Sequence, residues 1–534
     1  MRPSRFWSFQ FLSLLSMIAE TTSLSILQIS PGWSNSHIMF GHRLAKTLTD
    51  HGHNVTILIP LLNSGHPPSA QAPPGVEEIR YHLSTSEETQ RKTMEVFQDL
   101  SFQKPKLSFF FFIGVTFRQL AQNTADQLMS DHELMDRLRA QNFDLAMCHP
   151  FDIWQVGFSH QLGIKSFIWI APGAFLLDHI YWIMALPNHP ATVPNVMARC
   201  SDRMDFRERV KNVLFWILGM FFTSIDPLLT RSENTVYKKP PYHTEADSDL
   251  WRLAGQARAI FFNGEPVLDF TRPLVPGMFY LGDLDRHQLK PLPQEWQNIV
   301  DESKKGIIIF SFGTIANTSA MPLSLKQAFL DAFAKFSDYT ILWRLEGQMP
   351  NGLEKQKHVK LVKWIPQRSL LFHPKMKLFI THGGYNSLLE ASQAGIPMLL
   401  VPLFADQYAN AKRSSEHGTG LTLDKFTATC DTIEQSIRTI LTNKSFSSNS
   451  KSLSSELKDH IMDNQAVAMR HIKRVAAGNR FWPTMKAAQR LNWIQYICLD
   501  VIAFLAIVTL AVVGGLIVFV KASWRCIRKQ KGKR

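Results

Sequence analysis

Cysteine is scarce in this chain, with five in 534 residues, which is too few for a disulfide scaffold. Cys498 lies at the start of an apolar segment and Cys526 in a basic tail. Only Cys148, Cys200 and Cys430 remain for the main body. At most one internal disulfide can form among these three, so the fold must rest on a hydrophobic core.

Charge is also low. Charged residues make up 19% of the chain and hydrophobic residues 45%, which excludes a disordered protein. The net charge of +14 suggests a nucleic-acid partner at first, but seven of the basic residues lie in residues 521–534, and the other 51 basic and 44 acidic residues give only +7. No basic block with interleaved aromatic residues remains, so we expect no nucleic-acid binding. Solenoid repeats and low-complexity tracts are also missing.

The two ends of the chain predict a membrane protein. Residues 1–23 have the basic start and short apolar stretch of a signal peptide. Residues 501–520 form an unbroken apolar run, and about 20 helical residues cross a bilayer core. Lys and Arg concentrate in residues 521–534, which marks the cytosolic side. We therefore expect a type I protein of the endoplasmic reticulum membrane, with nearly all its mass in the lumen and the tail lysines as a retention signal.

Two further features concern this exposure to lumen and membrane. Asn54, Asn317 and Asn443 begin N-x-S/T sequons, which fit a lumenal chain. A second apolar run, residues 213–229, is interrupted by Asp226. We interpret it as an interfacial or substrate-lining helix, and a core helix is an equally good interpretation.

The order of apolar runs predicts two α/β domains. In the first half, a strand at 24–30, a helix at 36–51 and a strand at 54–60 form one βαβ unit. The alternation recurs in the second half, with strands at 306–311, 340–344, 358–363, 377–381 and 398–402, and helices at 325–336, 386–394 and 406–416. This pattern is typical of a doubly wound sheet, which binds ligands beyond the carboxyl ends of its strands.

One long segment decides the functional class. Residues 364–420 read WIPQRSLLFHPKMKLFITHGGYNSLLEASQAGIPMLLVPLFADQYANAKRSSEHGTG. This segment resembles the donor-binding signature of the UDP-glucuronosyltransferases, as do FSFGT at 310–314, ILWRLEG at 341–347 and WIQYICLDVIAFL at 493–505. The resemblance covers most of the chain and is strongest in its second half.

The resemblance implies two Rossmann-like doubly wound domains of the GT-B type plus one C-terminal transmembrane helix. In these terms the chain divides into a signal peptide (1–23), an acceptor-binding domain (24–285), a UDP-sugar-binding domain (286–478), a connecting segment (479–500), the transmembrane helix (501–520) and a basic cytosolic tail (521–534).

The chemistry of a UDP-sugar can be matched to residues of the signature. Trp364 offers a flat face for uracil, and Gln367 can pair with its amide edge. Glu390 can accept hydrogen bonds from both ribose hydroxyls. Taken alone, Trp364 has a simpler explanation as a core tryptophan in a turn. Glu390 has a simpler explanation as a solvated charge on a helix.

The diphosphate requires hydrogen-bond donors. The His382-Gly383-Gly384 turn leads from a strand into a helix, where unpaired N–H groups and the helix dipole attract phosphate, and glycine lets the backbone approach closely. The expected contacts are Ser311, Gly313, Thr314, Arg344, His382, Gly384, Asn386 and Ser387.

The resemblance implies that Asp406 and Gln407 bind the donor sugar. We find no metal-binding DxD motif, so we expect neither a metal nor another cofactor, and the UDP-sugar is a co-substrate.

Acceptor activation needs a general base, for which His37 is the candidate. It lies at a helix start, where the dipole disfavours the imidazolium, and the resemblance points to the same turn. The family supports this histidine with a carboxylate, but the matching position here holds His149, with Asp152 close by. We expect either Asp152 to orient His37 or His149 to substitute with lower activity.

The sequence thus predicts an inverting UDP-glucuronosyltransferase that acts on a hydroxyl of a small lipophilic acceptor. Aromatic residues such as Phe109 to Phe112 suit a lipophilic pocket or membrane contact, with ordinary core as the alternative. UDP-glucose is an alternative donor, because Asn263 stands where some glucuronate-using relatives carry an arginine. A second hypothesis is a non-catalytic member that binds UDP-sugar or pairs with an active partner. Assembly as a homo- or hetero-oligomer is compatible with either hypothesis. A weaker one is an epimerase or hydrolase.

Overall fold

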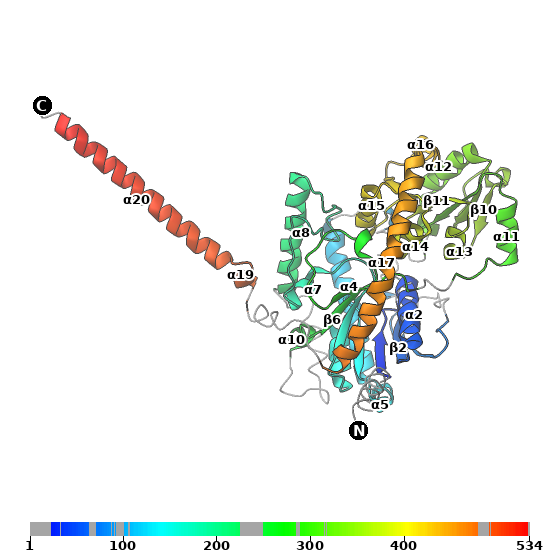
Figure 1. Cartoon of the computed structure of the whole chain (residues 1–534), viewed down its shortest axis with the longest axis horizontal. Helices are drawn as coiled ribbons and strands as arrows, with labels where there is room; N and C mark the ends of the chain where they lie inside the picture. The colour runs from blue at the N-terminus through cyan, green and yellow to red at the C-terminus, as the bar shows by residue number, and fades with distance from the viewer. Residues whose placement is uncertain are drawn as a thin grey trace, which may run out of the picture. The chain divides into compact units, whose positions relative to one another are not determined.

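The computed structural model describes two compact units, residues 1–481 and 482–534. The described residues run from 23 to 531, apart from residues 33, 63–70, 87, 90, 92–100, 105–106, 225–248, 285–288, 314–315, 317, 479–490 and 492. The predicted signal peptide up to residue 22, Thr314 and the Asn317 sequon therefore lie outside the described residues. The first unit contains two parallel sheets, each with helices packed around it (Figure 1).

The first sheet has seven parallel strands in the order β3-β2-β1-β4-β5-β6-β7. Its strands are β1 (Ser25–Ile29), β2 (Asn54–Leu62), β3 (Val76–Leu83), β4 (Leu145–Cys148), β5 (Phe167–Ala171), β6 (Ala259–Phe262) and β7 (Met278–Tyr280). The helices of this part are α2 (Asn35–Asp50), α4 (Leu107–Ser130), α5 (His132–Ala140), α6 (Trp154–Gln161), α7 (Asp178–Ile183), α8 (Phe206–Ser224) and α10 (Leu250–Ala254), with the 3-10 turn η2 (Pro266–Leu268).

The second sheet has six parallel strands in the order β10-β9-β8-β11-β12-β13. Its strands are β8 (Ile307–Ser311), β9 (Thr340–Arg344), β10 (Val359–Val362), β11 (Met376–Thr381), β12 (Met398–Leu400) and β13 (Gly420–Thr422). The helices are α11 (Gln294–Asp301), α12 (Leu323–Phe333), α13 (Gln367–Leu371), α14 (Tyr385–Ala394), α15 (Gln407–Glu416), α16 (Cys430–Thr442) and α17 (Lys444–Ala476), with 3-10 turns η3 (Thr318–Ala320), η4 (Ala334–Phe336) and η5 (Leu353–Lys355). Two Rossmann-like domains are confirmed.

The central strands are apolar because helices cover both faces of each sheet. β8 has the sequence IIIFS and β5 the sequence FIWIA, and all ten residues are buried, as expected of parallel strands. The described cysteines Cys148, Cys200, Cys430 and Cys498 are free thiols. The fold of the described residues therefore rests on these apolar layers.

Strand order places one crevice in each domain. Chain order reverses between β1 and β4 in the first sheet, and between β8 and β11 in the second. Helices leave such a pair toward opposite faces, which opens a crevice beyond the carboxyl ends of the two strands. In this chain those ends lead into His37 and His149 in the first domain, and into Gly313 and His382 in the second.

Helix α17 connects the two domains. Its first half places Leu453 and Leu457 in the core of the second domain. Its second half places Ile472 and Val475 in the core of the first. The chain thus returns to the domain in which it began.

The second unit contains α19 (Trp493–Tyr496) and α20 (Leu499–Lys531). The Leu499–Ala522 part of α20 is long and apolar enough to cross a membrane, with a mean hydropathy of 2.9. It includes the apolar run 501–520.

Candidate functional site

The two crevices of the first unit meet across the domain boundary. The Asn386 side-chain amide, at the start of α14, donates to the carbonyl oxygen of Ser36 at 3.4 Å. The Asn263 amide donates to Asn386 Oδ1 at 2.9 Å and to the carbonyl oxygen of Pro172 at 2.9 Å. Since Ser36 precedes His37, these bonds bring the predicted base and the predicted diphosphate site together.

The predicted nucleoside residues form one cluster. The Gln367 amide donates to Glu390 Oε2 at 2.7 Å and to Ser387 Oγ at 3.3 Å. Trp364, three residues before Gln367, is 50% exposed. An exposed indole, three residues from the glutamine that holds a carboxylate, suits a flat base joined to a diol.

Sequence reasoning missed Arg43, a residue of α2 in the other domain. Its Nη1 lies 3.6 Å from Glu390 Oε1, and both side chains are largely buried. Arg43 thus brings a cation from the first domain to the predicted ribose site. Its position two turns after His37 on one helix was the only signal in the sequence.

The turn after β11 is built around His382. A Cβ atom at Gly313 would lie 2.7 Å from the imidazole, and one at Gly384 would lie 2.6 Å from it. Only glycine fits at either position, since real Cβ atoms do not approach so closely. Gly313 and Gly383 also adopt φ values of 70° and 83°, which favour glycine.

Burial determines the charge of His382. Desolvation, with a smaller effect from Arg344, lowers its pKa to about 4. The ring is therefore neutral near pH 7, and one ring nitrogen can donate a hydrogen bond to an oxyanion.

Arg344 binds the backbone of the loop that contains Gly313. Its guanidinium donates to the carbonyl oxygens of Gly313 and Lys363, the latter at 3.0 Å, and to Glu346 at 3.3 Å. Ser311 Oγ accepts a hydrogen bond from the backbone N–H of Gly313 at 3.3 Å. Both side chains thus hold the loop backbone in this structure.

Asp406 and Gln407 lie at the start of α15. Gln407 Oε1 accepts from the backbone N–H groups of Leu403 and Phe404, at 2.8 and 3.1 Å. Asp406 Oδ2 accepts from the Asn410 amide at 2.8 Å, and burial raises the Asp406 pKa. Gln407 thus fixes the loop that presents Asp406.

The candidate base lies beside a second imidazole. The His37 and His149 ring centroids are 5.0 Å apart, and the His149 ring stacks on Phe151 at 4.6 Å. Burial lowers the His37 pKa to about 3 and that of His149 well below its usual value, helped by the neighbouring His37. Both rings are neutral at pH 7, and both ring nitrogens of His149 are buried without a hydrogen-bond partner.

Asp152, the other candidate support for His37, faces a residue of α6. Its Oδ1 accepts from the Gln155 amide at 2.9 Å, and Gln155 Oε1 accepts from the backbone N–H of His149 at 2.7 Å. Burial raises the Asp152 pKa to about 6. The structure thus places the His149 ring against the His37 ring, while Asp152 bonds to Gln155.

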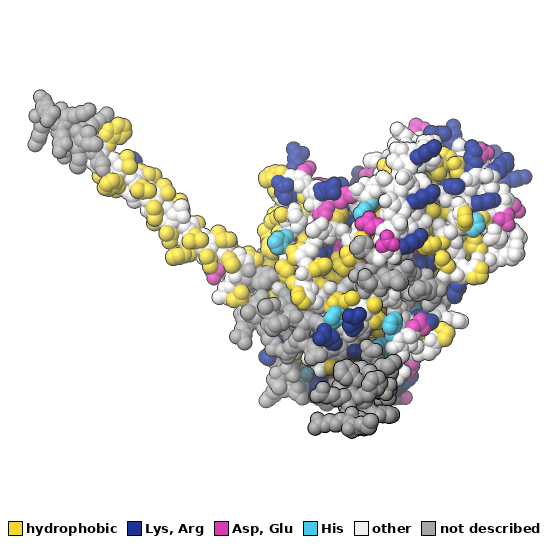
Figure 2. All heavy atoms as spheres, in the orientation of Figure 1, with side chains coloured by type: hydrophobic (Ala, Val, Ile, Leu, Met, Phe, Trp, Pro, Cys, Tyr) yellow, Lys and Arg dark blue, Asp and Glu magenta, His cyan; other side chains and the backbone are white. Residues whose placement is uncertain are grey.

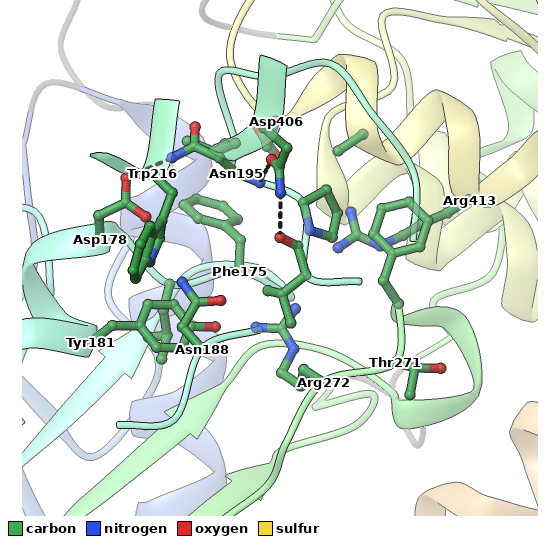
Figure 3. A pocket seen from close by; sticks show the side chains of 17 residues that line it. Phe175, Asp178, Tyr181, Asn188, Asn195, Trp216, Thr271, Arg272, Asp406 and Arg413 are labelled. Atoms are coloured by element: carbon green, nitrogen blue, oxygen red, sulfur yellow. Dashed lines mark hydrogen bonds between the residues drawn. The ribbon is translucent and has the colours of Figure 1, made fainter. Parts of the chain in front are cut away.

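A small pocket lies between α15 and the first domain. Figure 3 shows Asp406 and Arg413 facing Phe175, Asp178 and Trp216. The Asn195 amide donates to Asp178 Oδ2 at 2.5 Å, and burial raises the Asp178 pKa to about 7. Its walls combine aromatic and polar side chains. Phe109 to Phe112 belong to α4, but their side chains lie outside the described part.

The chain is similar in sequence to known proteins. Residues 27–534 match the sequence profile of a family described as UDP-glucoronosyl and UDP-glucosyl transferase. A putative UDP-glucuronosyltransferase, ugt-60, of Caenorhabditis elegans is 33% identical over 91% of this chain and 96% of its own. UDP-glucuronosyltransferase 1A8 of Rattus norvegicus is 30% identical over 93% of this chain and 91% of its own.

A solved structure supports the fold. The glycotransferase of kitacinnamycin superposes with a TM-score of 0.54 over 85% of this chain and 100% of its own, at 17% identity. At that identity the likeness concerns the GT-B arrangement alone.

Proposed function

Since the chain belongs to the UDP-glucoronosyl and UDP-glucosyl transferase family, we propose that it transfers the sugar of a UDP-sugar to a hydroxyl of a small lipophilic acceptor. One observation carries the proposal: the hydrogen bond from Asn386 to the carbonyl oxygen of Ser36. Through it the base candidate His37 meets the glycine-lined start of α14. A base and a phosphate site must lie this close for a sugar to pass between acceptor and UDP.

The nucleotide enters the second domain. Uracil stacks on the exposed face of Trp364, and the ribose hydroxyls donate to Glu390, which Gln367 holds in place. The diphosphate lies at the N-terminal end of α14, whose unpaired N–H groups and dipole attract an anion. If this is correct, replacing both Trp364 and Glu390 by alanine removes most of the affinity for UDP, as isothermal titration would measure. Full affinity in that variant would refute the whole assignment.

The transfer step uses neutral His37. The imidazole takes the acceptor's hydroxyl proton while the acceptor oxygen forms a bond to the anomeric carbon. The bond from that carbon to the β-phosphate oxygen breaks on the opposite face, and UDP leaves with the electron pair. Donation from His382 and the α14 backbone stabilises the departing charge. A single displacement inverts the anomeric centre, so an α-linked donor gives a β-glycoside.

The test of this step is His37→Ala. We expect loss of transfer with unchanged UDP binding, because the residue acts on the acceptor. Equal activity in the variant would remove His37 from the mechanism.

Glucuronate is the sugar we propose, because the curated relatives described above are named UDP-glucuronosyltransferases. UDP-glucose is the second candidate, because Asn263 is buried, uncharged and bonded to Asn386, whereas a glucuronate carboxylate calls for a cation. Competition between the two labelled donors for one acceptor decides between them.

A second candidate function is UDP-sugar binding without turnover, alone or beside an active partner. His149 favours it, because a neutral imidazole cannot stabilise a protonated His37 as a carboxylate would. UDP release with a panel of phenols separates the two functions, since donor binding without release would support the second.

For location, we propose a type I protein of the endoplasmic reticulum membrane, with α20 spanning the bilayer and both Rossmann-like domains in the lumen. The length and hydropathy of the Leu499–Ala522 part of α20 and the basic residues at the C-terminal end of the chain support this orientation. Glycosidase-sensitive glycans on Asn443 and protection of the domains from protease in sealed microsomes would test it.

A further inference from the structure

Helices α2 and α14 are joined by two contacts across the domain boundary. The Asn386 amide donates to the carbonyl oxygen of Ser36, and the Arg43 guanidinium pairs with the Glu390 carboxylate. Asn386 and Glu390 are four residues apart on α14. Ser36 and Arg43 are seven residues apart on α2. Each pair therefore lies on one face of its helix, and the two helices face each other beside the proposed nucleotide site.

Arg43 differs in its burial from the basic residues on the surface. Figure 2 shows many Lys and Arg side chains on the surface of the second domain, where solvent screens their charge. The side chains of Arg43 and Glu390 are only 14% and 11% exposed. Arg43 Nε also donates to the carbonyl oxygen of Met39 at 3.3 Å, which holds the side chain along α2. The guanidinium is thus fixed at the proposed ribose-binding carboxylate.

The distance between the two charged groups allows both to bind one hydroxyl. Arg43 Nη1 lies 3.6 Å from Glu390 Oε1, which exceeds the length of an ordinary N–H···O hydrogen bond, about 2.9 Å. The other carboxylate oxygen, Oε2, already accepts from Gln367 at 2.7 Å. A hydroxyl group donates one hydrogen bond and can also accept one. A single ribose hydroxyl can therefore donate to Glu390 Oε1 and accept from Arg43 Nη1.

We propose that Arg43 is a specificity-determining residue for the nucleotide, which donates a hydrogen bond to a ribose hydroxyl whose proton Glu390 accepts. This inference rests on the proposed UDP-sugar site and adds a residue of the first domain to it. The ribose is then bound by both domains, because Gln367 and Glu390 belong to the second. A nucleotide without this hydroxyl leaves the guanidinium without that acceptor, so the site discriminates against it.

Binding of the ribose also affects the base, because Arg43 and His37 belong to the same helix. A hydrogen bond from Arg43 to the ribose fastens α2 to the nucleotide that lies on α14. The bound nucleotide thereby helps to hold His37 beside the sugar that is transferred.

The test compares three nucleotides on the full-length chain in detergent. UDP, 2′-deoxy-UDP and 3′-deoxy-UDP are titrated calorimetrically into the natural chain and into Arg43→Met, which removes the guanidinium and keeps most of the apolar stem. We expect the substitution to raise the dissociation constant for UDP about tenfold or more. For the deoxynucleotide that lacks the bound hydroxyl, the same substitution should change the dissociation constant less than about twofold, because the interaction is already absent.

The matched control is Lys46→Met on the same helix. Lys46 forms an ion pair with Asp50 on a more exposed part of α2, so its loss should leave all three dissociation constants unchanged. If Arg43→Met does not fold, Arg43→Lys provides the same comparison, because an ammonium group keeps the charge but lacks the planar fork of the guanidinium.

The possible failures are distinguishable. Equal losses of affinity for all three nucleotides in Arg43→Met would overturn the proposal, because the residue would then act on the fold or the phosphates rather than on a ribose hydroxyl. An unchanged affinity for UDP would also overturn it. If the natural chain itself did not bind UDP, the proposed function would be refuted, and this inference with it.

Discussion

At the scale of single residues, the packing of His382 between two glycines gives a sharp test of the phosphate site. A methyl group at residue 384 would lie 2.6 Å from Nε2 of the imidazole, so Gly384→Ala must displace the ring or the turn. We expect the dissociation constant for UDP to rise at least about tenfold, because the loss of one charge-assisted hydrogen bond costs about 1.5–3 kcal/mol. Isothermal titration measures it.

The control for that variant is Gly352→Ala. Gly352 has a positive φ of 81°, unlike Gly384 with φ −59°, and an added Cβ there would meet nothing within 4 Å. It should lower stability by about 1 kcal/mol and leave UDP affinity unchanged. Equal losses of affinity in the two variants would show that a general loss of stability, rather than the contact with His382, explains the effect.

The pairing of two imidazoles predicts a gain of function from His149→Asp. A carboxylate beside His37 would raise its pKa from about 3 and stabilise the imidazolium that forms in the transfer step. We expect kcat/KM to rise by about tenfold or more.

The pKa of His37 determines where activity is lost as the pH falls. In the natural chain His37 stays unprotonated down to about pH 3, so its protonation removes no activity above about pH 4. In His149→Asp the acid limb should move to higher pH, because a base with a raised pKa is protonated sooner. The neutral His149→Asn serves as control and should leave the limb in place. A profile and rate unchanged by the carboxylate would contradict the role of His37.

Some site residues can be predicted from one short segment of the sequence, and others cannot. Trp364, Gln367, His382 and Glu390 lie on one continuous segment, so the strand-turn-helix pattern could predict the nucleotide side of the site. Arg43 reaches Glu390 from a helix some 350 positions earlier, and no local pattern specifies such a partner.

At the scale of elements, five strands of the second sheet were predicted, whereas β13 and the strands β3 to β7 of the first sheet were not. The expected strand at 340–344 matches β9, and the expected helix at 386–394 differs from α14 by one residue. An apolar run marks the strand, and Gly384 and Gly395 bound the helix. Helix α8 instead begins at Phe206, ahead of the apolar run at 213, because its first turns are charged and exposed.

Helix α17 could not be foreseen, since its apolar residues give no indication of which domain they join. Ile472 is fully buried in the first domain's core, so Ile472→Ala should lower the free energy of unfolding by about 2–5 kcal/mol. Because Leu457 of the same helix packs in the other core, we expect one cooperative transition at lower urea. Tryptophan fluorescence in detergent measures it.

The exposed Arg470 on the same helix provides a control, and Arg470→Ala should change little. Two separate transitions in Ile472→Ala, with only one of them shifted, would show that α17 does not couple the domains.

At the scale of the whole molecule, the arrangement of the two domains depends on buried charges far apart in sequence. Asp269 of the first domain accepts from Arg413 of α15 at 2.8 Å, from Arg272 and, at 2.6 Å, from the Tyr280 hydroxyl. Arg413 also donates to the carbonyl oxygen of Ala174 at 2.9 Å. Each partner alone is an ordinary charged residue, so only the assembled chain shows that they converge.

Asp269→Asn tests this network. The substitution keeps the shape of the side chain and removes its charge, which leaves two buried guanidinium groups without a counter-ion. Loss of one partner of a buried ion pair costs about 3–5 kcal/mol, so we expect a loss of that size in urea unfolding, with UDP affinity lowered as the domains separate. The matched control is Asp338→Asn, which breaks the exposed pair with Lys305 and should have little effect because solvent screens it. If the two variants unfolded alike, the buried network would contribute nothing to the closed arrangement, and helix α17 with the contacts of Asn386 and Arg43 would have to hold the domains together.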